Sequence, residues 1–241
     1  MKYIFITGSS KGLGKALAEL FLKQNEIKVT GMARSCSISD ENYVHLTLDL
    51  SNQQAVNDFT FPNLTDADEV ILVNNAGMLD PIKKVGTFTG AAVAMNVQVN
   101  LIAPMVLSSQ FIQAYQKLGC KKMILNISSG AGKYPIDGWA AYCTTKSGLD
   151  MFSTVMHAEQ NLISNVSNRV KIVALSPGII DTEMQAEIRS SKEEDFSQVD
   201  RFVDYKKSGE LQSSLQTADN IISKLHFLYN REEVICSLRD E

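Results

Sequence analysis

Residues 3–14 read Tyr-Ile-Phe-Ile-Thr-Gly-Ser-Ser-Lys-Gly-Leu-Gly, and this stretch decides the fold. The apolar, β-branched run at 3–6 predicts a buried strand. A glycine-rich turn follows, and then the helical pattern of residues 16–22. This order is typical of a dinucleotide-binding fold, in which glycines let the backbone approach a pyrophosphate and the helix N-terminus offers free N–H groups. The glycine spacing is Gly-x-x-x-Gly-x-Gly, and the alternative is an ordinary tight turn before a helix.

The rest of the chain alternates between strand-like and helix-like patterns. Long helices are expected at about 89–117 and 138–165, and residues 51–66, which contain Pro62, leave room only for a brief helix. This alternation predicts an α/β fold with one Rossmann-type, doubly wound parallel sheet of about seven strands and helices on both faces. No repeat or linker divides the chain, so residues 1–241 are expected to form a single domain. Strands are expected at residues 2–7, 27–32, 43–48, 69–73, 121–127, 169–176 and 233–238.

Residues 183–210 differ from the rest of the chain, because they are rich in Glu, Lys, Ser and Gln and show weak periodicity. Segments of this kind can cover a substrate and become ordered around it. The alternative is a solvated excursion with no role in binding. We expect a substrate-covering segment here.

Tyr142 and Lys146 lie four residues apart in a segment that is expected to be helical. On a helix this spacing places both side chains on one face, so an ammonium can lie beside a phenol. A free tyrosine titrates near ~10, and a neighbouring cation lowers that pKa. The pair therefore predicts a tyrosine that exchanges protons at neutral pH, although Tyr-x-x-x-Lys is also common on solvated helix faces.

Together with the glycine-rich turn, this pair resembles the short-chain dehydrogenase/reductase family. Further motifs occur in that family's order, and the resemblance covers about residues 2–185. Ser129 precedes Tyr142 by thirteen residues, which is the family's spacing for its catalytic serine. The other matching positions are Asn74-Asn75-Ala76-Gly77 after an apolar strand, Asn100 in a helix, and Pro177-Gly178 with Thr182.

The resemblance implies a reaction in which a nicotinamide delivers hydride to a carbonyl carbon. Tyr142 would donate a proton to the resulting oxyanion, and Ser129 would hydrogen-bond the same oxygen. Lys146 would hold the cofactor's ribose and lower the pKa of Tyr142. Asn100 would hold a water that feeds protons to Lys146, the alternative being a helix amide bonded to neighbouring backbone. Ser128 competes with Ser129, but adjacent strand side chains face opposite ways, so only one can reach the site.

The charges near the second expected strand indicate the form of the cofactor. A carboxylate at the end of that strand would bind a ribose 2′-hydroxyl and repel a 2′-phosphate. This chain has Arg34 there instead, and Lys11 lies in the glycine-rich turn. Both match positions with which NADPH-dependent members of the family hold the 2′-phosphate, so we expect NADP(H); two surface cations are the alternative.

The resemblance also assigns a set of cofactor contacts, with Asp49 on the adenine. The assigned residues are Gly8, Ser10, Lys11, Gly12, Leu13, Gly14, Arg34, Asp49, Leu50, Asn75, Ala76, Gly77, Tyr142, Lys146, Pro177, Gly178, Ile180 and Thr182.

Residues 126–151 and 176–184 look particularly like the sepiapterin reductase and benzil reductase subgroup of the family. Its members reduce a carbonyl beside a second carbonyl or an aromatic ring, which implies a 1,2-dicarbonyl substrate held by Ser129 and Tyr142. Trp139 and Tyr134 could stack on a planar substrate; the alternative is packing against the covering helices.

One position departs from the sepiapterin reductases. They carry an aspartate near the C-terminus that anchors the pterin, and matching the chain ends puts Ser237 there. Asp240 could take its place as a substrate contact if the last strand is shifted. Otherwise an aromatic or aliphatic 1,2-dicarbonyl fits better than a pterin.

Two other functions compete with this reading. A 3-oxoacyl thioester reductase of the same family would need a basic patch for an acidic carrier protein, whereas residues 183–210 mix both signs of charge. A non-catalytic NADPH-sensing protein is possible because a fold does not fix a function. Such proteins usually lose the tyrosine or the lysine, and this chain keeps both.

Composition bounds the partners and the location. The chain is 44% hydrophobic and carries a net charge of −4, so neither nucleic acid nor an anionic membrane is an expected partner. The four cysteines lack metal-ligand spacing and read as reduced thiols, and no metal is expected. No signal peptide or membrane-spanning run is expected, which favours the cytoplasm. In many relatives the two long helices form a dimer interface, so we expect a homodimer, or alternatively a tetramer.

Overall fold

The computed structural model describes residues 1–240, and of residue 240 only the backbone. One parallel sheet holds seven strands in the order β3-β2-β1-β4-β5-β6-β7. All the expected strands are present, and only the last is much shorter than its predicted range. The strands are β1 (Lys2–Thr7), β2 (Ile27–Ala33), β3 (Tyr43–Thr47), β4 (Glu69–Asn74), β5 (Lys121–Ile127), β6 (Lys171–Ser176) and β7 (Ile235–Ser237).

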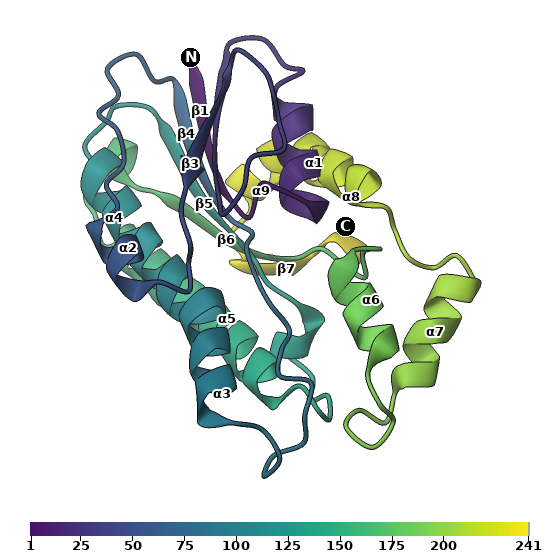
Figure 1. Cartoon of the computed structure of the whole chain (residues 1–241). Coiled ribbons are helices and arrows are strands. Elements are labelled where there is room, and N and C mark those ends of the chain that lie inside the picture. Colours follow the sequence, from purple (N-terminus) through teal and green to yellow (C-terminus); the bar gives the residue numbers. More distant parts are fainter. Residues whose placement is uncertain (241) are drawn as a thin grey trace.

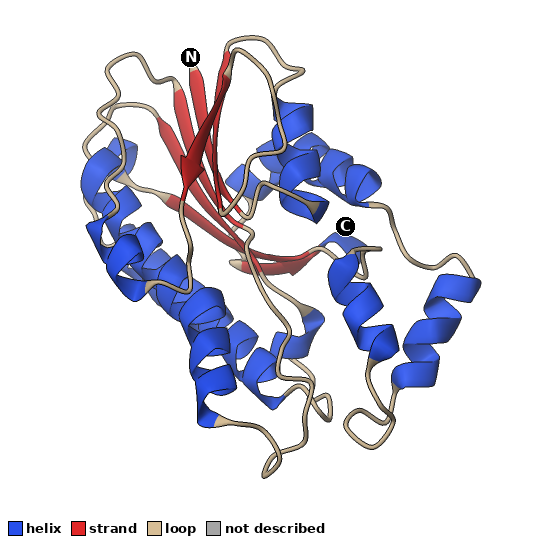
Figure 2. Ribbon diagram, in the orientation of Figure 1, coloured by secondary structure: helices blue, strands red, loops and turns tan. Residues whose placement is uncertain are grey.

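Helices cover both faces of this sheet, which confirms the doubly wound Rossmann-type fold (Figures 1 and 2). The helices α2 to α5 lie on one face, and α1, α8 and α9 lie on the other. The pair α6 and α7 extends beyond the sheet near the C-terminus. The helices are α1 (Gly12–Phe21), α2 (Gln53–Asp58), α3 (Gly90–Val97), α4 (Ala103–Tyr115), α5 (Ala140–Asn161), α6 (Glu183–Ser190), α7 (Val199–Lys207), α8 (Ser214–Ser223) and α9 (Leu225–Asn230).

Side chains of β1 show how the sheet separates two cores. Ile4 and Ile6 point to one face, where they join Leu17 of α1 and Ile221 of α8. Phe5 points to the other face because successive strand side chains alternate. It stacks on Tyr115 of α4, with ring centroids 6.0 Å apart, inside a cluster of aromatic rings.

The expected helix at 89–117 is one continuous helix, Gly90–Tyr115, that changes geometry in its middle. A π-helical turn, Gln98–Ile102, joins α3 to α4. The helix is 26 residues long and, by length and composition alone, could cross a membrane. The expectation that no apolar run reaches this length was therefore wrong. Core helices of soluble proteins can be equally long and apolar, and here α4 packs against β4, β5 and α5.

Buried polar side chains fix the carboxyl ends of the central strands to the helices on one face. The amide of Asn74, at the end of β4, donates to Ser108 Oγ of α4 (3.1 Å) and to Asn126 Oδ1 of β5 (2.8 Å). Asn126 in turn donates to Ser153 Oγ of α5 (2.8 Å). Buried polar groups are costly unless paired, so this network favours one position of α4 and α5 relative to the sheet.

Candidate active site

A large cavity of 1440 Å³ lies at the carboxyl ends of the strands. Strand order reverses between β1 and β4, and ligands of open α/β sheets bind at such a switch point. The cavity is lined from the glycine-rich turn after β1, through the ends of β4 and β5, to α6 and α7.

The glycine-rich turn is held tightly to the segment after β4. Thr7 Oγ1 accepts hydrogen bonds from the backbone N–H groups of Asn75 and Ala76, both at 3.0 Å. The Asn75 amide donates back to the carbonyl oxygen of Thr7 at 3.0 Å. A Cβ on Gly14 would lie 2.3 Å from the carbonyl oxygen of Gly8 and 2.4 Å from Asn75 Nδ2, so only glycine fits there.

This cradle fits a dinucleotide. No side chain caps the N-terminus of α1, so the N–H groups of its first turn are available to a phosphate. Every assigned cofactor residue lines the cavity except Gly14, which lies behind the turn. Those lining it are Gly8, Ser10, Lys11, Gly12, Leu13, Arg34, Asp49, Leu50, Asn75, Ala76, Gly77, Tyr142, Lys146, Pro177, Gly178, Ile180 and Thr182.

The two cations assigned to a 2′-phosphate differ in their surroundings. Arg34 follows β2 and is exposed at the rim of the cavity. Lys11 instead forms an ion pair with Glu183, the first residue of α6, across the cavity. Asp49 accepts hydrogen bonds from the backbone N–H and the hydroxyl of Ser51, which, together with nearby Arg34, lower its pKa.

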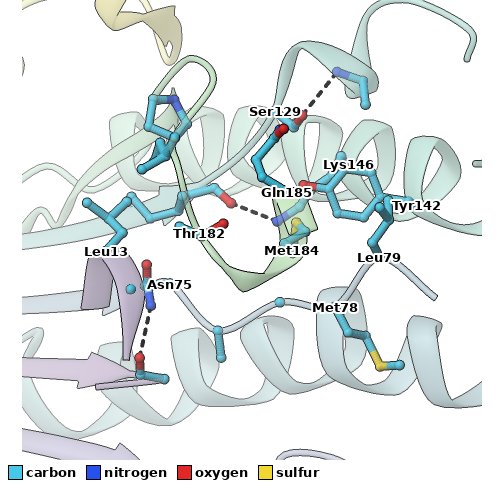
Figure 3. A pocket seen from close by; sticks show the side chains of 18 of the residues that line it. Leu13, Asn75, Met78, Leu79, Ser129, Tyr142, Lys146, Thr182, Met184 and Gln185 are labelled. Carbon is cyan, nitrogen blue, oxygen red and sulfur yellow. Dashed lines mark hydrogen bonds between the residues drawn. The ribbon is translucent and has the colours of Figure 1, made fainter. Parts of the chain in front are cut away.

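Three of the four predicted catalytic residues, Ser129, Tyr142 and Lys146, line one cavity (Figure 3). Ser129 begins the 3₁₀ turn Gly130–Gly132, and its Oγ accepts the N–H of Ala131 at 3.2 Å. The Ser129 hydroxyl also lowers the pKa of the phenol of Tyr142, which lies on the first turn of α5 and lines the same cavity. The Oγ of Ser128 donates instead to Asp150 Oδ1 of α5 (2.5 Å). Strand alternation thus separates the two serines as expected.

Burial governs the protonation of Tyr142 and Lys146. It raises the pKa of Tyr142 to about 12, against a lowering by the hydrogen bond with Ser129. It lowers the pKa of Lys146 to about 8, against a raising by Asp150. Lys146 Nζ donates to the carbonyl oxygen of Ile127 at 2.8 Å and lies 5.6 Å from the centroid of the Tyr142 ring. The expectation that Lys146 lowers the pKa of Tyr142 is therefore not met here, because removal from water is the largest effect on that phenol and Lys146 is not among the groups that shift it.

Asn100 lies in the π turn, fully buried. Its Oδ1 accepts the N–H of Met78 at 2.9 Å and its Nδ2 donates to the carbonyl oxygen of Met78 at 2.7 Å, so it fixes the segment after β4. A Cβ on Gly77 would lie 3.4 Å from Asn100 Oδ1 and 3.8 Å from Lys146 Nζ, which places both side chains close to that glycine. The alternative of an amide bonded to backbone is thus present, and the water-holding role stays a prediction.

Aromatic residues form the wall beyond Tyr142. The Trp139 ring meets the Tyr142 ring edge-on, with centroids 5.9 Å apart, and lies 5.2 Å from Phe196 and 5.4 Å from Phe202 of α7. Trp139 is buried, so it both packs against the covering segment and lines the cavity. Tyr134 is exposed at the rim.

Comparisons with known proteins agree with this geometry. A sequence profile of the family described as short chain dehydrogenase matches residues 2–193. The benzil reductase ((S)-benzoin forming) of Bacillus subtilis (strain 168) is 37% identical over 231 residues, which cover 93% of each chain.

This chain belongs to the short chain dehydrogenase family.

Two further proteins are similar to this chain. The sepiapterin reductase of Meriones unguiculatus is 28% identical over 204 residues, covering 75% of this chain and 74% of its own. A crystal structure of a short chain dehydrogenase/reductase from Saccharomyces cerevisiae has a TM-score of 0.80 at 23% identity over 100% of this chain and 97% of its own, so it shares the fold. The protein is thus a carbonyl reductase of the benzil and sepiapterin reductase subgroup, in a family that uses a nicotinamide cofactor.

The C-terminal part of the chain also reaches the cavity. Ser237 and Arg239 both line it, and the Arg239 guanidinium lies against Gly178. The backbone of Asp240 ends a 3₁₀ turn, but its side chain, a proposed substrate contact, lies outside the described residues. Ser237 therefore stands in the cavity where the sepiapterin reductases are expected to carry an aspartate.

Sequence reasoning missed several lining residues on the covering segment. Gln185 and Ile188 of α6 and Phe202 and Tyr205 of α7 all face the cavity. Their signal was weak because residues 183–210 have little periodicity. A Thr-x-x-Gln spacing at 182–185 could have indicated the start of α6.

A methyl group at position 14 tests the dinucleotide cradle. We expect Gly14→Ala to lower the free energy of unfolding by about 1–3 kcal/mol, because the added Cβ overlaps Gly8 and Asn75. We also expect nicotinamide dinucleotide binding, followed by fluorescence, to weaken about tenfold or more. Gly90→Ala is the control, since nothing lies within 4 Å of a Cβ at that position. Unchanged dinucleotide binding in Gly14→Ala would contradict the assignment.

Proposed function

We propose that this protein uses NADPH to reduce one ketone of a 1,2-dicarbonyl compound, of the benzil or sepiapterin kind. The observation that carries the proposal is the position of Tyr142, which lines one cavity together with Ser129 and meets the ring of Trp139 edge-on. The cavity therefore offers two hydroxyl donors for one carbonyl oxygen beside an aromatic wall. The sequence similarity of this chain to a benzil reductase supports this substrate class.

The residues divide the chemistry of the reduction between them. A bound nicotinamide supplies the hydride to the carbonyl carbon. Ser129 Oγ donates a hydrogen bond to the carbonyl oxygen and stabilises the negative charge that develops there. Tyr142 Oη, protonated at neutral pH because burial raises its pKa to about 12, gives its proton to that oxygen.

Lys146 and Asn100 support this proton transfer. Because the pKa of Lys146 is about 8, the ammonium is largely charged at neutral pH and can stabilise the phenolate left on Tyr142. Asn100, bonded to Met78, holds the segment that passes beside Lys146. A water held near Asn100 would return a proton to Lys146.

NADPH is favoured over NADH by the charges at the rim. No carboxylate stands directly after β2, where Arg34 and Ser35 follow Ala33, and the guanidinium of Arg34 is exposed there to form a bidentate contact with a 2′-phosphate. Lys11 is a weaker candidate, because its ammonium already has a partner in Glu183.

A homodimer is proposed from the outer surface of α4 and α5. Met105 of α4 (38% exposed) and Met151 and Val155 of α5 (64% and 47% exposed) leave apolar side chains in solvent. In the most apolar stretch of the helix Gly90–Tyr115, only 33% of the residues are buried within the chain. A second copy would cover this surface, in keeping with the two long helices as an interface. We propose no nucleic acid or membrane partner, and the cytoplasm as its location.

Replacing the phenol tests the reaction. We expect purified protein to oxidise NADPH with benzil or sepiapterin, and Tyr142→Phe to lower kcat by about 100-fold or more because it removes the proton donor. A 3-oxoacyl thioester is assayed beside them. Preference for the thioester would favour the carrier-protein alternative, and tight NADPH binding without Tyr142-dependent turnover would favour the sensor.

Removing each rim cation tests the choice of cofactor. We expect Arg34→Ala to raise the KM for NADPH roughly 10- to 100-fold, the contribution of a charge-assisted contact, with little change in the KM for NADH. Lys11→Ala should have a smaller effect because of its pairing with Glu183. A wild-type preference for NADH would contradict NADPH as the cofactor.

Charges placed on the apolar surface test the dimer. We expect the wild-type protein to sediment as a dimer and the double variant Met151→Lys, Val155→Lys to sediment as a monomer, because two ammonium groups would be buried without partners. Leu162, which directly follows α5, is 85% exposed. Leu162→Lys is therefore the matched control and should leave the sedimenting mass unchanged. A monomeric wild type would rule the interface out.

A further inference from the structure

Gln185 is a buried polar residue of the cavity that the proposed mechanism does not use. Its side chain is 7% exposed, lines the cavity, and in the view of Figure 3 extends from α6 toward Ser129. Its Oε1 is buried and has no hydrogen-bond partner among the described residues. A buried amide oxygen without a partner destabilises a fold, so it needs a reason other than packing.

Another glutamine of this chain shows that a residue at this position of a helix can form an N-terminal cap. At the start of α8, Ser213 and Gln216 form a complete capping box: Ser213 Oγ accepts the N–H of Gln216, and Gln216 Oε1 accepts the N–H of Ser213. Thr182 and Gln185 have the same spacing at the start of α6, but Thr182 makes no side-chain cap. The Gln185 amide is thus not used to cap its own helix, and it faces the cavity.

We propose that the carboxamide of Gln185 binds the second oxygen of the substrate, on the carbon next to the carbonyl that is reduced. This proposal rests on the proposed function. Ser129 and Tyr142 both serve the oxygen being reduced, which leaves the neighbouring oxygen without a partner from either residue. An amide can donate from Nε2 to a carbonyl or accept at Oε1 from a hydroxyl, so Gln185 suits a 1,2-diketone or an α-hydroxyketone.

Trp139 is the competing candidate, because its Nε1 is also buried without a partner and its ring lines the same cavity. The indole can only donate, and its ring is held between Tyr142, Phe196 and Phe202. It forms the wall, whereas the amide of Gln185 is not held by these contacts between aromatic rings and lines the same cavity as Ser129. The two can be separated by mutation.

Two ketones that differ by one oxygen test the proposal. Benzil has a second carbonyl beside the one reduced, and deoxybenzoin has a methylene there. For Gln185→Leu we expect kcat/KM with NADPH to fall about tenfold for benzil and to stay within about twofold for deoxybenzoin, the effect of one lost hydrogen bond. Its melting temperature should stay level or rise, because an unpaired buried amide is removed. Comparing each ketone between variant and wild type cancels their different intrinsic reactivities.

The matched control is Gln216→Leu, the same exchange in the formed capping box. It should lower the melting temperature and leave both kcat/KM values within about twofold of wild type, since α8 loses its cap. Trp139→Phe removes the competing donor and keeps a ring in the wall.

Each outcome decides the proposal. A selective loss for benzil in Gln185→Leu supports it. Equal loss for both ketones, or no loss, overturns it while wild-type reduction of benzil leaves the proposed function standing. A selective loss in Trp139→Phe but not in Gln185→Leu overturns it in favour of the indole. Absence of Tyr142-dependent reduction of either ketone by the wild type overturns both the proposal and the dicarbonyl function beneath it.

Discussion

The exchange of hydrogen bonds between Thr7 and Asn75 is the contact on which the site depends. It joins the end of β1 to the end of β4, the two strands between which the sheet reverses its order. The glycine-rich turn and the segment that carries Gly77 are therefore fixed to each other before any ligand contacts them. Since Gly14 packs against this junction without room for a methyl group, helix, turn and loop share a single arrangement.

The catalytic end of the cavity is built by a second set of fixed contacts. The Asn100 amide spans the backbone of Met78, and Lys146 donates to Ile127 at the end of β5. Both side chains come from helices on one face of the sheet, whose positions are set by the buried amides of Asn74 and Asn126. Rigid contacts of this kind hold the reacting side chains in place at little entropic cost during the reaction.

The sequence was sufficient for the sheet, the family and the convergence of the glycine-rich turn, Ser129, Tyr142 and Lys146. These features depend on local patterns, because apolar runs define parallel strands and the motifs follow at fixed spacing after them. The pKa of Tyr142 was not predictable, since its rise comes from burial beneath residues distant in sequence. The pairing of Lys11 with Glu183 and the orientation of Gln185 also depend on where α6 lies, and weakly periodic residues do not determine that.

The π turn at Gln98–Ile102 corresponds to one extra residue inserted within a helix, not within a loop. Each residue of an α-helix advances the side chains by about 100° around the axis, so the faces of α3 and α4 are offset from those of an uninterrupted helix. The segment before the turn can therefore direct Asn96 at the backbone carbonyl oxygens of Met78, Leu79 and Asp80, while the segment after it divides its side chains between sheet and solvent. Deletion of a single residue here would rotate the side chains before the turn relative to those after it. A deletion in a loop would only shorten the connection.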